Sequence, residues 1–599
     1  MYLQLNRHNL YQLHKVSLIP PHFFIILTRN CCFYCRIFVC CIIKINKEDF
    51  NMKILIIGGG ACGASAAARL RRLDDNAEIL ILEKTHEISI ANCGLPYYCS
   101  DIIDSEEKMH VSSVQKFKNL LNVDIKMGAN VTAINRIDKT VTVNDSEVLS
   151  YDKLVLTPGA EPFVPDIQGI NNPKIHTLRM LKDGNAIKEI VKNTNAKNAV
   201  VIGGGFIGVE MAENFKHLKD VNTTLVELSS HILPPVDKET AAFAQNEMRK
   251  NGVNLVLSDG VKAFDNDYVV LNSGRKLPYD IAVLAIGVKP QTSLARECGL
   301  VIGKSGGVKV NEHMQTSDPD IYAGGDSVEV TDFVTNADVL IPLAGPANRQ
   351  GRIIADNIAG YKSVYKKTIG SAVVKVFDLT IANAGNSEEN LIKRNIPYWK
   401  TFTYGFSHAS YYPGATRTMY KLLFNAQGDI LGVQAAGYEG VEKRVDVIAT
   451  SMRNSLKVWD LIDSELCYAP PYSSAKDPVN ILGMHADNIL KGFVKPAYFE
   501  DIKDSVLVDV RPAADYANET IDGALNIPTP ELRSRCDELP KDKKVILFCN
   551  TGFQSYVASR ILLQRGFNNV YSLTAGIELY KELVKNQKAL AAETAATVV

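Results

Sequence analysis

The chain has 599 residues, enough for several domains with sizeable cores. Its 66 basic and 66 acidic side chains give a formal net charge of zero, and no basic tract stands out, which argues against nucleic acid as a partner. Five of the twelve cysteines lie in the first 41 residues, and the other seven are scattered without a disulfide framework, so we expect a cytoplasmic protein.

The N-terminal segment, residues 1–51, does not match the rest of the chain. Arg29 and Arg36 interrupt its apolar runs, so it lacks the apolar stretch of about 20 residues that spans a membrane, and it lacks a signal-peptide pattern. Its cysteines supply no paired motifs at structural-zinc spacing, and we predict no metal site. A dinucleotide domain starts a few residues before its first strand, as at Met52. We therefore expect the segment to be disordered or absent from the mature protein.

A glycine-rich motif follows the first predicted strand, residues 53–57, and opens a predicted helix. Glycines in such a turn let the backbone approach a pyrophosphate, and the helix N-terminus offers it free N–H groups. Glu83 ends the next predicted strand, where an acid can hold the ribose hydroxyls of an adenine nucleotide. The glycines of the motif are Gly58, Gly60 and Gly63.

The same pattern occurs again after the predicted strand 199–202. An acid, Glu227, follows at the matching distance, and a carboxylate there favours NADH because it repels a 2′-phosphate; NADPH is kept as an alternative. One such motif is weak evidence, but two with strand, helix and acid predict two dinucleotide sites. The second set of glycines is Gly203, Gly205 and Gly208.

Residues 316–326 predict a short strand that ends in Gly-Gly-Asp, and Asp326 is placed to hydrogen-bond the ribityl chain of a flavin. Alone this motif would be an ordinary turn, but beside two dinucleotide motifs it predicts a flavoprotein that receives electrons from a nicotinamide. Residues 156–160 and 285–290 are the expected crossings between the two nucleotide domains. The remaining predicted cofactor contacts are Lys84, Thr157, Gly159, Gly287 and Gly325.

These signals resemble the two-dinucleotide flavoprotein disulfide reductases, from about residue 52 to 483. The segment 89–98, Ser-Ile-Ala-Asn-Cys-Gly-Leu-Pro-Tyr-Tyr, is similar to the active-site segment of the coenzyme A (CoA) disulfide reductases and their NADH oxidase and persulfide reductase relatives. In that branch one cysteine replaces a dithiol, so the resemblance implies that Cys93 is redox-active; the alternative is a buried structural thiol. We expect Cys99 to be inert rather than a resolving partner, and Cys62 to pack.

The resemblance also implies contacts with CoA. Arg69 and Arg72 lie three residues apart and share a helix face that meets the CoA phosphates in the family, although a solvated face is the alternative. Tyr468 and either Tyr411 or Tyr412 are implied to supply phenols that steady or protonate a thiolate in the partner subunit's active site; a surface tyrosine pair is the alternative. The other implied substrate contacts are Ser65, Ser89, Asn92, Asn348 and Lys476.

A further unit is predicted near the C-terminus. A predicted strand ends at Cys549, and the loop before the next helix offers N–H groups that depress a thiol pKa. With Asp509-Val510-Arg511, the segment resembles a rhodanese domain, which implies that Cys549 handles sulfane sulfur. Gln554 stands where rhodanese loops commonly carry Arg, which puts thiosulfate sulfur transfer in doubt, and an inactive rhodanese fold is the alternative.

The predicted fold class is α/β, with two Rossmann-like dinucleotide-binding domains (FAD and NAD), an α+β dimerisation domain that makes a homodimer, and a C-terminal α/β rhodanese domain. The sheet strands of the dimerisation domain are expected to alternate between buried and exposed residues. The predicted boundaries are 52–165 and 288–365 for the FAD domain, 166–287 for the NAD(P)H domain, 366–484 for the dimerisation domain, 485–500 for a linker and 501–590 for the rhodanese domain.

The leading hypothesis is an FAD-dependent NAD(P)H reductase of CoA disulfide or CoA persulfide, or polysulfide, that acts through Cys93. An NADH oxidase that reduces oxygen, with Cys93 as a redox centre through its sulfenic acid, is the alternative, and the fused rhodanese unit argues against it. A redox-sensing or sulfur-carrier scaffold is disfavoured by two intact nucleotide sites. Small thiols, disulfides and persulfides are the expected partners, with neither nucleic acid nor membrane.

Overall fold

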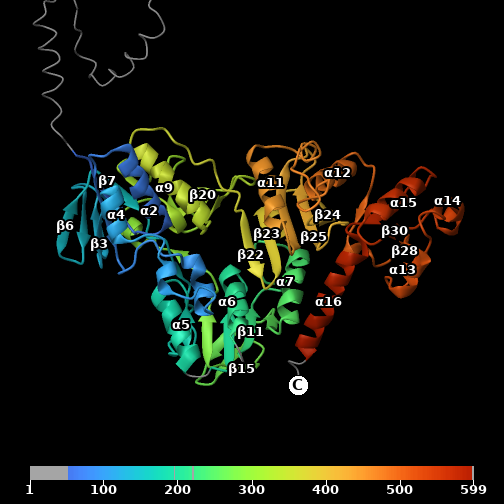
Figure 1. Ribbon diagram of the computed structural model, residues 1–599, viewed down its shortest axis with the longest axis horizontal. Helices are drawn as coiled ribbons and strands as arrows, with labels where there is room; N and C mark the ends of the chain where they lie inside the picture. The colour runs from blue at the N-terminus through green and yellow to red at the C-terminus, as the bar shows by residue number, and fades with distance from the viewer. Residues whose placement is uncertain (1–50, 194–195, 219–220, 596–599) are drawn as a thin grey trace, which may run out of the picture. The chain divides into compact units, whose positions relative to one another are not determined.

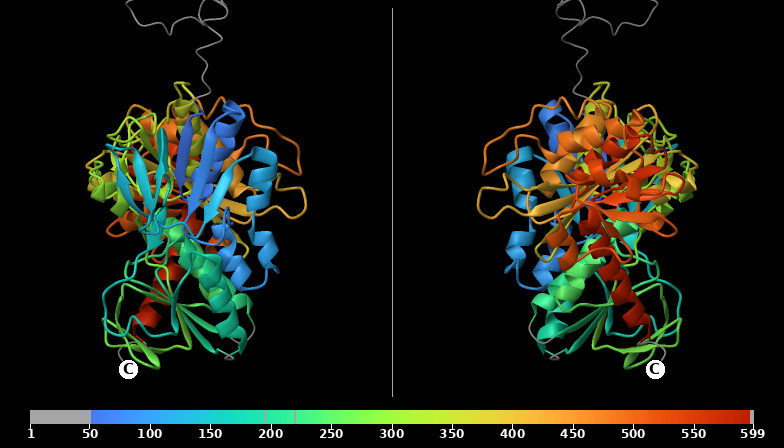
Figure 2. Two further views of the ribbon diagram at one scale, coloured as in Figure 1. Left: turned by 90° about the vertical axis from the view of Figure 1, so that its left-hand side faces the viewer. Right: turned by 90° about the vertical axis from the view of Figure 1, so that its right-hand side faces the viewer.

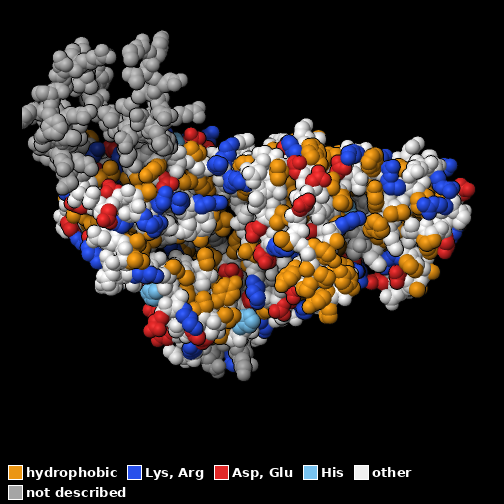
Figure 3. Space-filling view, turned by 45° about the horizontal axis from the view of Figure 1, so that its top comes forward, with side chains coloured by type: hydrophobic (Ala, Val, Ile, Leu, Met, Phe, Trp, Pro, Cys, Tyr) orange, Lys and Arg blue, Asp and Glu red, His pale blue; other side chains and the backbone are white. Residues whose placement is uncertain are grey.

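The computed structural model describes residues 51–193, 196–218 and 221–595. The expectation for the N-terminal segment rests on residues 1–50, which lie outside these ranges. Within the described ranges, no helix is both long and apolar enough to cross a bilayer. On the face shown in Figure 3, basic and acidic side chains are interspersed rather than gathered into one tract.

The first dinucleotide domain is built on a five-stranded parallel sheet in the order β19-β7-β1-β2-β3 (Figure 1). The central strand β1 is buried after its first residue, as expected for a sheet covered on both faces. The late strand β19 pairs with β7, so the chain returns to this sheet after the second domain. The strands are β1 (Lys53–Ile57), β2 (Glu78–Glu83), β3 (Asp124–Met127), β7 (Lys153–Leu156) and β19 (Ile321–Ala323).

Two helices from distant parts of the chain pack together on this domain. They are α2 (Ala61–Leu73), which follows the first glycine motif, and α9 (Ala344–Ile358). A small antiparallel sheet stands beside the parallel one. It consists of β4 (Val131–Asn135), β5 (Thr140–Val143) and β6 (Glu147–Ser150).

The second dinucleotide domain repeats the design with a parallel sheet in the order β12-β11-β10-β16-β9. Its helices are α5 (Leu181–Asn193), α6 (Phe206–His217) and α7 (Lys238–Lys250). The two parallel sheets confirm the predicted pair of Rossmann-like folds. The strands are β9 (Ile175–Thr177), β10 (Asn198–Ile202), β11 (Asn222–Glu227), β12 (Asn254–Leu257) and β16 (Ile281–Leu284), with an antiparallel sheet of β13 (Val261–Phe264), β14 (Tyr268–Leu271) and β15 (Lys276–Pro278).

Short elements connect the two domains. The two predicted crossings lie side by side, because β8 (Ala160–Pro162) pairs antiparallel with β17 (Val288–Pro290). The segment that carries Cys93 consists of the 3-10 helix η3 (Asn92–Gly94) and α3 (Leu95–Cys99), and α3 packs on both α5 and α6. The other short elements are η4 (Glu106–Met109), α4 (Val114–Leu121), α8 (Ser293–Glu297), β18 (Val308–Lys309), η5 (Gly325–Ser327), β20 (Val328–Thr331) and β21 (Asp338–Val339).

The third domain holds an antiparallel sheet in the order β22-β23-β26-β25-β24. Helices α11 (Val441–Arg453) and α12 (Pro478–Leu490) cover one face, and α6 and α7 of the second domain cover the other. The expected alternation is therefore wrong for the central strands: every residue of β26, and all but the first of β25, is buried, because both faces are covered. The elements are β22 (Ala372–Val376), β23 (Leu379–Gly385), α10 (Glu388–Lys393), β24 (Trp399–Phe406), β25 (Arg417–Phe424) and β26 (Ile430–Gly437).

The C-terminal domain has a parallel sheet in the order β27-β31-β30-β28-β29. The expected linker at 485–500 differs in the structure: α12 continues to Leu490, and β27 (Pro496–Ala497) already pairs with β31. Hydrophobic side chains such as Ile489 keep the helix packed beyond the expected boundary. The elements are η6 (Phe499–Asp501), β28 (Val506–Asp509), α13 (Ala513–Asn518), β29 (Leu525–Asn526), α14 (Leu532–Arg535), η7 (Cys536–Glu538), β30 (Val545–Phe548), α15 (Phe553–Leu563), β31 (Val570–Leu573) and α16 (Gly576–Ala595).

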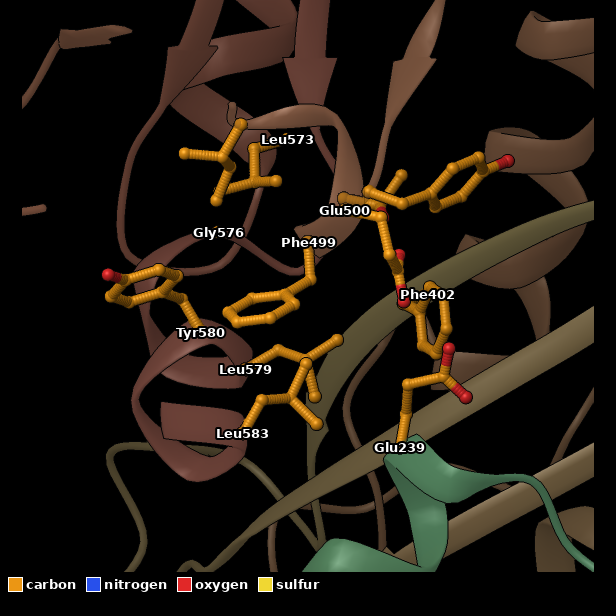
Figure 4. Close-up of a pocket in the computed structure, with 12 residues that line it drawn as sticks. Glu239, Phe402, Phe499, Glu500, Leu573, Gly576, Leu579, Tyr580 and Leu583 are labelled. Carbon is orange, nitrogen blue, oxygen red and sulfur yellow. The ribbon is translucent and has the colours of Figure 1, made fainter. Parts of the chain in front are cut away.

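Helix α16 joins this domain to the second dinucleotide domain, where it runs beside α7 (Figures 1 and 2). Arg249 of α7 donates from Nε and Nη2 to the two carboxylate oxygens of Glu593, at 2.7 and 2.9 Å, and from Nη1 to Asn586 Oδ1. Near the start of α16, Phe499, Leu579 and Tyr580 line a small cavity (Figure 4). Its volume of about 20 Å³ is room for little more than one water, so the seam is closely packed.

Candidate functional site

The first glycine motif forms the turn that the sequence predicts. Gly58 has φ +96°, and a Cβ on Gly63 would lie 2.0 Å from the Gly58 carbonyl oxygen, so strand and helix could not approach as they do. A Cβ on Gly60, the N-cap of α2, would meet nothing within 4 Å. The free N–H groups of α2 therefore face open space at the place where a pyrophosphate would bind.

The acid at the end of β2 is fixed by the same turn. The Gly59 N–H donates to Glu83 Oε2 at 2.8 Å, and the Thr85 N–H donates to Oε1 at 2.9 Å. Thr157 closes the other side, because its hydroxyl donates to the carbonyl oxygens of Ile57 and Gly58, both at 2.9 Å. Thr157 thus shapes the turn through the backbone.

The second site repeats these contacts. Gly203 has φ +103°, a Cβ on Gly208 would lie 1.9 Å from the Gly203 oxygen, and a Cβ on Gly205 would meet nothing within 4 Å. The Gly204 N–H donates to Glu227 Oε2 at 2.6 Å, and the Ser229 N–H donates to Oε1 at 2.7 Å. Two equivalent sites with equivalent acids fit two dinucleotides.

The first site also fits the charged and polar parts of FAD. Arg179 carries a buried Nη1 without a hydrogen-bond partner, and its nearby acids include Glu83 and Asp326, at the predicted ribose and ribityl ends. Burial raises the pKa of Asp326, and the Arg179 charge opposes that rise. The buried Nη1 of Arg179 is therefore available to an anionic group, and sequence reasoning did not select this residue because no motif surrounds it.

The other predicted cofactor contacts lie around these turns. Gly159, Gly287 and Gly325 have φ values of +77°, +112° and +77°, and the Gly325 N–H donates to Gln350 Oε1 at 2.7 Å. Lys84 is exposed beside Glu83.

Cys93 is exposed in η3, two residues before α3 begins. Ser89 enters this segment with φ +54°, and its N–H donates to the Gly59 carbonyl oxygen at 3.3 Å, which ties the segment to the first glycine turn. Partial burial raises the pKa of the Cys93 thiol, and the negative charges of Glu210 and Asp326 raise it further. Cys93 therefore lies between a residue of the first site and a residue of the helix that follows the second glycine motif.

Two nearby cysteines differ from Cys93. Cys99 is buried, and burial raises its pKa to about 12. Cys62 lies inside the first glycine motif, where burial also raises its pKa. Burial therefore favours the neutral thiol, the less nucleophilic form, at both cysteines.

Five of the residues implied for CoA binding differ in how the protein holds them: two bond to each other, one forms an ion pair and two are exposed. Ser65 of α2 donates from Oγ to Asn348 Oδ1 of α9 at 2.5 Å, so the structure brings these two together. Arg69 forms an ion pair with Asp356 at 2.8 Å, whereas Arg72 and Asn92 are exposed. Arg69 is thus held by the protein, and a CoA phosphate would have to share it with Asp356 or take Arg72 instead.

The predicted tyrosines form a cluster on the third domain. The hydroxyls of Tyr411 and Tyr468 lie 2.8 Å apart, and these side chains are 74% and 48% exposed. Tyr412 packs its ring against His408, with centroids 5.6 Å apart. Exposed phenols bonded to each other are available to a second copy of the chain.

Lys476 is exposed at the rim of a polar pocket of about 370 Å³. Glu465, Ser474 and Asn480 also line this pocket. Asp477, the next residue, is buried in an ion pair with Arg444 at 3.1 Å and caps α12, which fixes the backbone at Lys476.

Cys549 lies at the end of β30 and is buried. The Gly552 N–H donates to its Sγ at 3.2 Å, and Ser555 Oγ lies 3.8 Å from the same sulfur. Gln554 is exposed. The sulfur of Cys549 therefore accepts from one neutral donor of its own loop, the Gly552 N–H, while Ser555 Oγ donates to the Gly552 carbonyl oxygen.

A cation does approach this loop from elsewhere. Arg511, after β28, donates from Nη1 to Asn550 Oδ1 at 3.0 Å, and its hydrogen bond with Asp509 is the main cause that raises its pKa. Asp509 binds the same guanidinium, with Nη2 to Oδ2 at 2.7 Å, so most of this positive charge is neutralised.

Within the described part of the chain, one cluster has the composition of a metal site: Asp237, Glu239 and Glu388. The buried ammonium of Lys421 forms ion pairs with all three, at 2.9 Å to Asp237 and 2.8 Å to Glu239. These carboxylates raise the pKa of Lys421. The cluster is an ion-pair network between the second and third domains, and the lysine takes the place that a metal would need.

Comparison with known proteins agrees with this geometry. Residues 52–351 match the model of the pyridine nucleotide-disulphide oxidoreductases, residues 371–478 match the dimerisation domain of that family, and residues 496–583 match a rhodanese-like domain.

Similar proteins cover most of the chain. A structure of reduced CoADR-RHD from Bacillus anthracis is 45% identical, covers 89% of this chain and 98% of its own, and has a TM-score of 0.87. An NAD-dependent persulfide reductase from A. fulgidus is 37% identical, covers 88% of this chain and 100% of its own, and has a TM-score of 0.84. The coenzyme A disulfide reductase of Staphylococcus haemolyticus is 33% identical over 73% of this chain and 100% of its own length.

Proposed function

Because the chain belongs to the pyridine nucleotide-disulphide oxidoreductase family, we propose that it is an FAD-dependent NAD(P)H reductase of CoA disulfide or CoA persulfide. The observation that carries this proposal is the position of Cys93. It is an exposed cysteine at the meeting point of two dinucleotide sites, with Asp326 of one and Glu210 of the other beside it. Such a thiol can reach both a flavin and an external sulfur compound.

FAD, when bound, supplies the chain with hydride transfer from NAD(P)H and with an electron pair for the sulfur of Cys93. The chain's part is to hold the two nucleotides. Glu83 and Glu227 would hold ribose hydroxyls, the N–H groups of α2 and α6 would bind pyrophosphates, and Arg179 would neutralise phosphate charge. The acid at Glu227 favours NADH over NADPH.

Cys93 performs the sulfur chemistry. Its thiolate attacks one sulfur of CoA disulfide, which forms a Cys93–CoA disulfide bond, breaks the substrate bond and releases one CoA thiolate. Attack on the CoA-bound sulfur of CoA persulfide gives the same mixed disulfide and releases hydrosulfide. Two electrons then cleave this mixed disulfide, which returns Cys93 to the thiolate and releases its CoA as a thiolate that takes up a proton. Both substrates therefore share one intermediate.

The active site is completed by a second copy of the chain in a homodimer. The matching dimerisation domain and the exposed Tyr411–Tyr468 pair support this arrangement. One phenol of the pair is placed to protonate the CoA thiolate that leaves the partner's Cys93 site, while its neighbour stabilises the phenolate by a hydrogen bond. Ser65, Arg72, Asn348 and Lys476 are proposed to bind CoA.

The C-terminal domain is proposed to supply the persulfide. The Cys549 thiolate takes a sulfane sulfur from a donor, and a CoA thiolate then attacks the outer sulfur, which regenerates Cys549 and forms CoA persulfide. The Gly552 N–H stabilises the negative sulfur between the two transfers. We place this cycle in the cytoplasm, where thiols are kept reduced.

NADH and NADPH consumption by the purified holoenzyme, with CoA disulfide, CoA persulfide or oxygen as the acceptor, tests the proposal. We expect both sulfur acceptors to be reduced much faster than oxygen, and NADH to be used in preference to NADPH. Oxygen as the fastest acceptor would instead identify an NADH oxidase.

A further inference from the structure

A pair of polar side chains joins α3, the helix that follows Cys93, to α6 of the second dinucleotide domain. Tyr97 of α3 donates its hydroxyl to Glu210 Oε1 of α6 at 3.3 Å. Both side chains are half-buried, and a second bond fixes the same contact between the helices, from Ser100 Oγ to Asn214 Oδ1 at 2.5 Å. Tyr97 lies one helical turn after Cys93, so the pair is held against the reactive segment.

The ionisation of Glu210 is finely balanced. Burial raises its pKa to about 7, the hydrogen bond from Tyr97 lowers it, and the charge of Glu213 raises it. Its charge is also a main reason, after burial, why the pKa of the Cys93 thiol is raised. Glu210 therefore changes charge in the pH range in which the enzyme must form the Cys93 thiolate.

The other charged groups around the pair are already partnered or act at a distance. Glu213, on the same helix, is neutralised by Lys375 of β22 at 3.3 Å and accepts from the Phe377 N–H; His217 lies 3.5 Å from it. Asp326 of η5 also raises the pKa of Cys93 through its charge. On α5, Lys188 is bound to Asp101 and does not pair with Glu210.

We propose that Glu210, held by Tyr97, is a positioning residue that controls when Cys93 is present as the reactive thiolate. When Glu210 is ionised, loss of the thiol proton places two negative charges side by side. When Glu210 is neutral, the same proton loss creates only one. Helix α6 follows the second glycine motif and carries Glu210. The helix proposed to bind the nicotinamide nucleotide therefore also carries the charge that acts on Cys93.

This inference rests on the proposed role of Cys93, and its test is separate from turnover. The rate of Cys93 alkylation by iodoacetamide, followed by peptide mass spectrometry from pH 5 to 10 in the reduced holoenzyme, reports the thiolate fraction. We expect Glu210→Gln to lower the apparent pKa of Cys93 by about one unit, so that alkylation becomes roughly tenfold faster between about pH 7 and the Cys93 midpoint. At pH 5, where Glu210 is neutral in the wild type as well, the two curves should coincide. Glu189→Gln, an exposed acid on α5, is the matched control and should leave the curve unchanged.

Tyr97→Phe provides a second reading that a purely structural role would not produce. Without the phenol the pKa of Glu210 rises, so alkylation should accelerate near neutral pH and coincide with the wild-type curve at high pH. Tyr97→Phe also tests the inference if Glu210→Gln loses its flavin and cannot be measured as a holoenzyme. Identical alkylation curves for wild type, Glu210→Gln and Tyr97→Phe would overturn the inference while leaving the proposed role of Cys93 to be judged by turnover.

Discussion

Cys93 and Cys549 are surrounded in opposite ways. Cys93 is exposed in a 3-10 helix, and the acids Glu210 and Asp326 disfavour its thiolate. Cys549 is only 3% exposed, with a backbone N–H 3.2 Å from its sulfur. The difference matches two tasks: a cysteine that exchanges electrons must be open to cofactor and substrate, whereas a cysteine that stores a sulfur must shelter a negative charge.

Among changes at the Cys549 site, the largest expected effect is loss of sulfur delivery in Cys549→Ser. We expect this variant to lose most persulfide-dependent NADH oxidation when the sulfur comes from an external sulfane donor, because a hydroxyl cannot carry the sulfur. Reduction of CoA disulfide, which needs only Cys93, should be nearly unchanged. Both rates are read from NADH absorbance. If donor-dependent oxidation stays unchanged in Cys549→Ser, the proposal that Cys549 supplies the CoA persulfide is contradicted.

Gln554→Arg should raise the thiosulfate sulfurtransferase activity of the C-terminal domain, because it adds a cation to the loop that follows Cys549. An exposed glutamine offers only a neutral hydrogen bond to an anionic donor, and a charge-assisted bond is about twice as strong. A gain of about 1.4 kcal/mol corresponds to roughly tenfold in thiosulfate sulfurtransferase activity. Brisk thiosulfate turnover by the wild type would contradict this account, because the loop would then not need the cation.

A smaller effect is expected from Gly576→Ala, which acts on the Cys549 loop from behind. Gly576 has φ +59°, and a Cβ there would lie 2.2 Å from the Cys549 carbonyl oxygen, so the loop would have to shift. We expect destabilisation of about 1–3 kcal/mol and slower sulfur transfer, with Cys93 alkylation unchanged. Gly523→Ala is the control, since it has φ +78° but open space around the new Cβ. Equal losses of sulfur transfer in both variants would show that backbone strain alone explains the effect.

Much of the fold follows from local patterns in the sequence. The two glycine motifs and their acids predict both dinucleotide turns, because the tight approach at Gly63 and Gly208 leaves no room for another residue. The segment around Cys93 and the strand-loop-helix at Cys549 are also local features. Their roles in catalysis remain predictions.

What the sequence did not indicate depends on contacts between distant residues. Tyr97 and Glu210 are 113 residues apart, and the Arg249–Glu593 pair that fixes α16 is 344 residues apart. The burial of Lys421 within β25 depends on helices that cover both faces of the sheet, whereas strand alternation assumes one exposed face. Arg179 lies in no motif, and its proposed phosphate contact rests on its orphaned buried nitrogen.

The central claim is that Cys93 reduces the CoA disulfide and that Cys549 does not. NADH consumption with CoA disulfide, measured in parallel for Cys93→Ser and Cys549→Ser holoenzymes with equal flavin content, tests it most directly. We predict that Cys93→Ser loses turnover by about a thousandfold or more, as expected for removal of a nucleophile, while Cys549→Ser stays close to wild type. Near-wild-type turnover by Cys93→Ser would contradict the account.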